Sequence, residues 1–268
     1  MPLIETPSGV NLHYLESGSG RPVVFVHGWA MSSRVWRFQQ QLEGSSRLIF
    51  LDQRGHGQSS PTATYSVQDY ADDLGSFFER LELTDAVLVG WSMGVQVALQ
   101  AFPLLKERLG GLVFVGGTPR FTTADGYPHG KPTLEVKGMG VRLKRDRQKT
   151  MGDFFRGMFA EGELEKARYQ RIVHEIVMAG RSPDPEAVRQ SLNILSTADQ
   201  REMLPTVDRP VLLVHGDLDT ICPASASAYM AERLPRATLE IMQGMGHAPF
   251  MSHPDRFNEV LRGFLGRV

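Results

Sequence analysis

Short apolar runs recur along the chain, and each is followed by glycine or a turn-forming sequence. Five of these runs lie at residues 23–26, 48–51, 86–89, 112–115 and 211–214. Runs this short, and apolar on both faces, are typical of strands buried in a parallel sheet. Residues 10–15 alternate between apolar and polar positions and predict an outer antiparallel strand, and residues 237–242 predict the last strand.

Helical patterns fill the intervals between the apolar runs. Residues 66–83 open with Ser66 and Asp69, a variant of the capping box, and continue with one apolar stripe. Residues 92–104 and 254–265 predict two further helices. Because strands and helices alternate, we predict an α/β protein with a mostly parallel sheet flanked by helices.

One region departs from this alternation. Residues 120–195 contain helical patterns and no buried strand pattern. We therefore predict a helical cap inserted between the sixth and seventh strands. Residues 1–119 and 196–268 would then form the core domain.

Composition and charge exclude several classes of partner. The 268 residues are 41% hydrophobic and 22% charged, and 29 Lys+Arg balance 30 Asp+Glu to a net charge of −1. A near-neutral chain has no global electrostatic reason to bind nucleic acid or anionic membranes. No apolar run approaches the roughly 18 residues of a membrane span, and the first eight residues lack the pattern of a secretory signal. We expect a soluble, cytoplasmic protein.

The strongest chemical signal is the sequence G-W-S-M-G at residues 90–94. It follows a predicted strand and precedes a predicted helix, which is the context of the nucleophile elbow. A serine in so tight a turn needs small neighbours, and Gly90 and Gly94 provide them. Ser92 is therefore the predicted nucleophile.

A serine hydroxyl needs a base, and the base needs an orienting acid. On this kind of fold the order along the chain is serine, acid, histidine. His247 lies in a glycine-rich loop right after the last strand and is the predicted base. The loop after residues 211–214 offers Asp217 and Asp219, and the spacing from the glycine favours Asp219 as the acid. Asp217 is expected to satisfy its own turn.

Acyl transfer also needs hydrogen-bond donors for the developing oxyanion. The backbone N–H of Met93, just after the nucleophile, is one predicted donor. The sequence H-G-W at residues 27–29 follows the strand at 23–26, so we assign the second donor to the amide of Trp29. No metal or cofactor is needed for such a reaction, and the single cysteine, Cys222, excludes an internal disulfide and a cysteine-based metal cluster.

These motifs together resemble the α/β-hydrolase superfamily across the whole chain. The resemblance implies an eight-stranded sheet with the cap after the sixth strand. G-W-S-M-G, H-G-W, the segment at 199–205 and H-A-P-F-M-S-H-P at 247–254 are similar to the pimeloyl-[acyl-carrier protein] methyl ester esterases of biotin synthesis. That likeness implies substrate contacts at Trp29, Ser92, Met93, His247, Phe154 and Met158. The chain departs from many relatives at Val95, where they carry a second glycine.

The first part of the predicted cap is basic. Residues 131–156 hold eight Lys+Arg and three Asp+Glu, a net charge of +5 against −6 for the rest of the chain. A charge run of this kind is commonly a solvated helix face. The family resemblance instead implies that it binds an acidic acyl carrier protein, through Arg142, Lys144, Arg145, Arg147 and Lys149.

Other functions remain as alternatives. A broad-specificity short-chain esterase or lactonase, or a cofactor-free haloperoxidase, would share the same catalytic residues. A non-catalytic ligand-binding protein could also use this fold, because a fold does not determine a function. The glycines near His56 lack the third glycine of a nucleotide-binding loop, and His215, Asp217 and Asp219 lie too close together in sequence for a good metal cage.

Overall fold

The computed structural model of the protein describes residues 2–44 and 46–268. Met1 lies outside the described residues. It belongs to the first eight residues, for which the sequence predicts no secretory signal. Eight strands form one sheet in the order β1-β2-β4-β3-β5-β6-β7-β8. The strands are β1 (Leu3–Glu5), β2 (Asn11–Ser17), β3 (Arg21–Val26), β4 (Ser46–Leu51), β5 (Ala86–Trp91), β6 (Leu109–Val115), β7 (Val211–Gly216) and β8 (Ala237–Met242).

The predicted strands are confirmed, with one addition at the edge. β2 pairs antiparallel with β4, whereas β3 to β8 all pair in parallel with one another. The three-residue β1 pairs antiparallel with β2 and forms the outer edge, so β2 is not the outermost strand. Every residue of β5 and β7 is buried, which explains why these strands are apolar on both faces.

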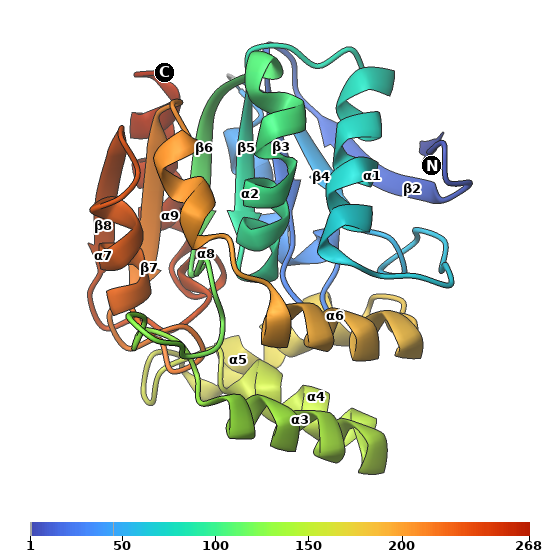
Figure 1. Ribbon diagram of the computed structural model, residues 1–268, viewed down its shortest axis with the longest axis vertical. Coiled ribbons are helices and arrows are strands. Elements are labelled where there is room, and N and C mark those ends of the chain that lie inside the picture. The colour runs from blue at the N-terminus through green and yellow to red at the C-terminus, as the bar shows by residue number, and fades with distance from the viewer. Residues whose placement is uncertain (1, 45) are drawn as a thin grey trace.

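Helices flank the sheet, and α1 and α2 cover the face turned toward the viewer in Figure 1. α1 begins after Ser66, whose side chain and Asp69 form the predicted capping box. α9 packs against α8 and against the 3₁₀ segment η1. The helical elements of this core are η1 (Ser33–Leu42), α1 (Val67–Arg80), α2 (Met93–Leu105), η2 (Lys106–Arg108), η4 (Arg201–Thr206), α7 (Ser225–Ala231), α8 (Pro249–Ser252) and α9 (Pro254–Leu265). Among the described residues, no helix has the length and apolar character needed to span a bilayer.

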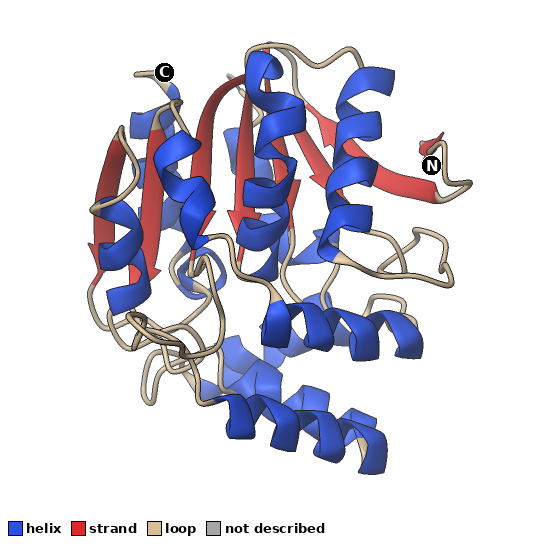
Figure 2. Ribbon diagram, viewed as in Figure 1, coloured by secondary structure: helices blue, strands red, loops and turns tan. Residues whose placement is uncertain are grey.

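The predicted helical cap lies between β6 and β7 in the chain. It contains α3 (Thr133–Arg145), α4 (Arg147–Arg156), α5 (Lys166–Ile172), the π-helical turn η3 (Val173–Met178) and α6 (Pro185–Thr197). The arrowheads of the parallel strands point toward these helices in Figure 2. The loops at the carboxyl ends of the strands therefore face the cap, which is where ligands bind in α/β sheets. The division at residues 120 and 195 stays a prediction.

Candidate active site

Ser92 lies at a sharp turn between β5 and α2. Its backbone has φ 55° and ψ −118°, a conformation that is rare for any residue other than glycine. A Cβ on Gly90 would lie 2.5 Å from the carbonyl oxygen of Gly94, and a Cβ on Gly94 would lie 2.5 Å from that of Val26. Glycines at these two positions therefore permit the turn, as the sequence pattern predicts. Such local strain is typical of functional sites.

The loop after β3 lies directly against this serine. A Cβ on Gly28 would lie only 3.0 Å from Ser92 Cβ. His27 Nδ1 lies 2.8 Å from the carbonyl oxygen of Gly28 and donates to it, while His27 Nε2 accepts a hydrogen bond from the amide of Gln53. The peptide plane holds the Gly28 carbonyl and the Trp29 N–H on opposite sides, so the bond from His27 also sets the direction of that N–H. Burial lowers the pKa of His27, which favours the neutral form that this arrangement requires.

His247 follows β8 in a loop that contacts both the core and the cap. Its amide donates to the carbonyl oxygen of Met158 at 2.7 Å, and its own carbonyl accepts from Trp91 Nε1 at 2.9 Å. The His247 Nε2 atom is buried and has no hydrogen-bond partner among the described residues. Because Trp91 precedes Ser92, the loop of His247 lies beside the elbow with its Nε2 uncommitted. Hydrogen bonds of catalytic groups are often formed only once substrate binds.

Asp219 orients the imidazole from the loop after β7. Its Oδ2 atom lies 2.7 Å from His247 Nδ1, and its Oδ1 atom accepts the amides of Ile221 and Cys222. Burial alone would raise the pKa of Asp219, but the charge of His247 and hydrogen bonds from His215 and His247 hold it below its ordinary value. The carboxylate is therefore ionised and can stabilise an imidazolium.

Asp217 has a different role in the same loop. Its Oδ1 atom accepts the backbone amides of Gly244 and Met245, in the loop that leads to His247. The structure thus brings Asp219 to His247 and leaves Asp217 as a support for the neighbouring turn.

A second histidine contacts Asp219, and sequence reasoning assigned it no role. His215 Nε2 lies 3.1 Å from Asp219 Oδ2, and both side chains are fully buried. The signal was present in the motif H-G-D-L-D, where His215 stands at the end of β7, four residues before the acid. The described residues contain no group of three or more His, Cys, Asp or Glu side chains arranged to hold a metal ion.

Two cap residues implied by the resemblance lie close to the site. The ring of Phe154 on α4 meets the ring of Trp29 edge-on, with centroids 4.9 Å apart. Met158 is fully buried and contacts His247 through its carbonyl oxygen. Glu163 adds a further link that the sequence did not suggest, because its Oε2 atom accepts the amide of Gly246 at 2.9 Å. The cap thus holds both the Trp29 and the His247 loops.

A cavity of about 610 Å³ lies beside the oxyanion loop, between the core and the cap. Ala30, Met31 and Ser32, which follow Trp29 directly, form its core wall, and Met151 and Phe155 of α4 lie on its cap side. Arg147 also lines this cavity and is half-buried, so it differs from the other four predicted carrier-binding residues. Those four are exposed on α3 and α4: Arg142, Lys144, Arg145 and Lys149.

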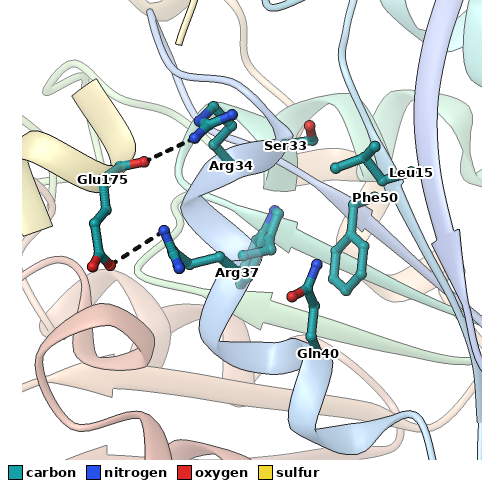
Figure 3. Close-up of a pocket in the computed structure, with 8 residues that line it drawn as sticks. Leu15, Ser33, Arg34, Arg37, Gln40, Phe50 and Glu175 are labelled. Carbon is teal, nitrogen blue, oxygen red and sulfur yellow. Dashed lines mark hydrogen bonds and ion pairs between the residues drawn. The ribbon is translucent and has the colours of Figure 1, made fainter. Parts of the chain in front are cut away.

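A smaller pocket of about 210 Å³ marks another junction between the core and the cap (Figure 3). Two arginines of η1 reach across to Glu175 in the π-helical turn of the cap. Arg37 pairs with the carboxylate at 3.2 Å, and Arg34 donates to the backbone carbonyl at 3.2 Å. These contacts fix the turn whose next residues, Ile176, Val177 and Met178, line the larger cavity.

The arrangement can perform nucleophilic acyl transfer. It combines a serine at an elbow, an uncommitted imidazole nitrogen beside it, and a buried carboxylate on the other side of the imidazole. The predicted oxyanion donors are the amides of Trp29, in the loop after β3, and of Met93, directly after the serine. These are the chain segments where an oxyanion hole is expected. Serine hydrolases use this combination of groups.

Comparisons with known proteins agree with this class. The sequence pattern of the alpha/beta hydrolase family matches residues 23–260. A solved esterase from Exiguobacterium antarcticum superposes with a TM-score of 0.92 at 29% identity, covering 98% of each chain. A solved bromoperoxidase from Bacillus anthracis superposes with a TM-score of 0.89 at 27% identity, covering 96% of each chain. The chain therefore belongs to the alpha/beta hydrolase family and is a hydrolase of the esterase class.

A curated relative carries a more particular name. The pimeloyl-[acyl-carrier protein] methyl ester esterase of Nitrosomonas europaea is 35% identical over 248 residues, which are 92% of this chain and 96% of that protein. The likeness to that group of esterases is confirmed, and it extends over nearly the whole chain.

Proposed function

We propose that this protein is a serine carboxylesterase that cleaves the methyl ester of an acyl group carried on an acyl carrier protein, with the methyl ester of pimeloyl-acyl carrier protein in biotin synthesis as its substrate. The reaction is the one named for its 35% identical relative. We place the reaction in the cytoplasm, the location expected from the sequence. The catalytic residues are Ser92, Asp219 and His247.

The site performs the reaction in two stages. Ser92 Oγ attacks the ester carbonyl carbon while His247 Nε2 takes the hydroxyl proton. The amides of Trp29 and Met93 stabilise the oxyanion, and the tetrahedral intermediate collapses as His247 returns the proton to the leaving methanol. Water, activated by the same imidazole, then hydrolyses the acyl-enzyme. Asp219 keeps His247 in the productive tautomer and stabilises its charged form.

The proposal of a carrier-linked substrate rests on the outer surface of the cap. Arg142, Lys144 and Arg145 are exposed on α3, and none of them forms an ion pair with a described residue. On the same helix Leu134 is 80% exposed and Val141 is 68% exposed. Cations around exposed apolar side chains suit a partner that is acidic and amphipathic, as an acyl carrier protein is.

This surface is connected to the chemistry through α4. That helix begins at Arg147, directly after α3, and carries Phe154 against Trp29. A carrier held on α3 and α4 would therefore lie close to the entrance of the site. Positive charge there would speed encounter and set the orientation of the carrier.

The test compares a carrier-linked methyl ester with a small free ester, p-nitrophenyl butyrate. The double variant Arg142→Glu/Arg145→Glu should raise KM for the carrier-linked ester and leave kcat/KM for the small ester nearly unchanged. Added salt should slow only the carrier-linked reaction, because surface charges are screened. Ser92→Ala should abolish turnover of both esters.

Arg80→Glu/Arg267→Glu is the matched control. Arg80 is the last residue of α1, and Arg267 is the last residue but one of the chain. The labelled C-terminus lies at the end of the sheet away from the cap (Figure 1). This pair makes the same change in net charge and should leave both reactions unaffected. Equal effects of the cap variant on both esters, or none on either, would leave a broad-specificity esterase. The solved neighbour from Exiguobacterium antarcticum is named simply as an esterase.

A further inference from the structure

The carboxylate of Asp219 is shared by two histidines. The Oδ2 atom that lies 2.7 Å from His247 Nδ1 also lies 3.1 Å from His215 Nε2. His215 is the fifth residue of β7, and its side chain is fully buried. The site therefore contains a second imidazole, in addition to that of His247, which acyl transfer uses.

The neighbours of His215 determine where its proton lies. His215 Nε2 is also 2.7 Å from the carbonyl oxygen of Cys222. A carbonyl and a carboxylate only accept hydrogen bonds, so Nε2 must carry a proton. Its hydrogen bond is to the Cys222 carbonyl, and the Asp219 carboxylate lies beside the same N–H at 3.1 Å. On the other side of the ring, Nδ1 lies 2.6 Å from the hydroxyl oxygen of Ser227 on α7. The ring is thus held at both ends.

We propose that His215 is a positioning residue for the reaction, whose Nε2–H holds the Asp219 carboxylate ionised and in the rotamer that receives His247. This inference rests on the proposed roles of Ser92, Asp219 and His247. A hydrogen bond to the charged form of a carboxyl group favours that form. It also adds a side-chain donor to the two backbone amides at Oδ1, so both carboxylate oxygens are fixed in place.

The N–H of His215 also affects how strongly His247 holds a proton. A carboxylate that receives an N–H from His215 attracts the proton on His247 less strongly. Loss of this donor would make His247 keep its proton to higher pH, and the acid limb of the kcat/KM profile would move upward. The direction is the same if the His215 ring carries a positive charge, because removing that charge also favours protonation of His247.

The Cys222 thiol and the Glu163 carboxylate are titratable groups near Asp219 and His247. The protonation of neither group depends on the N–H of His215. Burial raises the pKa of the Cys222 thiol well above its ordinary value, so the thiol stays neutral. Glu163 of the cap accepts the amides of Ala160 and Gly246 through Oε2.

The test uses His215→Gln and His215→Asn as a matched pair. The glutamine amide can place an N–H where Nε2 stood and can still reach Asp219. The shorter asparagine reaches the Ser227 hydroxyl but not Asp219. Both variants keep a polar side chain at the same position of β7, so we expect them to change the free energy of unfolding by similar amounts. Ser227→Ala is the third variant, because it removes the support at Nδ1 and leaves the Nε2 donor in place.

The measurements are kcat and kcat/KM for p-nitrophenyl butyrate across pH, together with the thermal unfolding midpoint. His215→Asn should lower kcat by about 10- to 100-fold, the effect of losing one hydrogen bond to a charged group. It should also move the acid limb upward by about half a pH unit or more. His215→Gln should keep the wild-type limb. Ser227→Ala should lower the unfolding midpoint without moving the limb.

A purely structural role for His215 makes a different prediction. All three variants would then lose stability and keep the wild-type acid limb, and that result would overturn the proposal. Equal pH profiles for His215→Asn and His215→Gln would overturn it as well. Failure of the site itself is recognised separately, because Ser92→Ala would then retain esterase activity.

Discussion

Asp219 Oδ2 lies 2.7 Å from His247 Nδ1, a contact that joins the loop after β7 to the loop after β8. The carboxylate of Asp217, two residues earlier, accepts hydrogen bonds only from the backbone amides of Gly244 and Met245 among the described residues. Although both carboxylates lie in one short loop, only one is placed to orient an imidazole.

The two aspartates should therefore respond differently to the same change. Asp219→Asn should lower kcat on the order of 10⁴-fold, because an amide favours the wrong tautomer of the base. Asp217→Asn keeps an oxygen that can accept the same amides and should cost less than tenfold. Steady-state kinetics with p-nitrophenyl butyrate measures both. A damaging Asp217→Asn with a benign Asp219→Asn would reverse the assignment of the acid.

The sequence was sufficient to predict the chain segments that converge on this site. Ser92 and Asp219 each follow a strand whose apolar run is easy to recognise, and His247 follows the last predicted strand. The carboxyl ends of parallel strands meet at one edge of the sheet. The motif around each residue then indicates its chemistry. Local pattern and topology were enough in this part of the protein.

Features that depend on packing between distant segments could not be predicted. β1 is only three residues long and has too little pattern to be recognised. Arg147 belongs to the same basic run as Arg142 and Arg145, yet it lines the cavity because α4 packs over the oxyanion loop. The contact between His215 and Asp219 depends on the exact turn of the three residues that separate them. Composition and periodicity do not report such contacts.

The bond from His27 to the Gly28 carbonyl leads to a second prediction. His27→Leu removes the donor that fixes this peptide, so the Trp29 N–H would lose its direction toward the oxyanion. Because that N–H acts mainly in the transition state, kcat should fall by about 10- to 100-fold while KM changes little. His27→Asn can place an N–H near the position of Nδ1 and should recover part of the activity.

Steady-state kinetics of the two His27 variants distinguishes this effect from misfolding. Circular dichroism and thermal unfolding should show both variants folded. If His27→Leu raised KM and left kcat unchanged, the bond would support substrate binding rather than the oxyanion.

The cavity beside the oxyanion loop leads to a third prediction, which concerns acyl-chain length. Met151 lines the cavity from α4, and Met151→Trp would fill part of its 610 Å³. If the acyl chain occupies this space, kcat/KM for p-nitrophenyl octanoate should fall by about tenfold or more relative to the butyrate ester. Asp153→Trp, exposed on the same helix and outside the cavity, is the control. An equal loss for both esters would place the acyl chain elsewhere.

Stability toward acid should depend on a histidine buried below the site. His56 Nδ1 lies 2.8 Å from the carbonyl oxygen of Arg54, and its ring centroid is 5.1 Å from that of His27. Burial is the main cause that lowers the pKa of His56, to about 3. In the unfolded chain the imidazole binds a proton below pH about 6.5. The unfolded state therefore binds more protons between these two values, and the free energy of unfolding must fall as the pH decreases through that window.

The expected size of this effect makes it measurable. One imidazole that stays neutral in the folded state costs about 1.4 kcal/mol for each pH unit below 6.5, or about 2 kcal/mol at pH 5. His56→Phe keeps an aromatic ring and removes the titrating group, so its free energy of unfolding should depend less steeply on pH. Urea unfolding of both proteins at pH 7.5, 6 and 5 measures the two slopes. Identical slopes would mean that His56 binds its proton equally well in the folded and unfolded chains, against the burial that the structure shows.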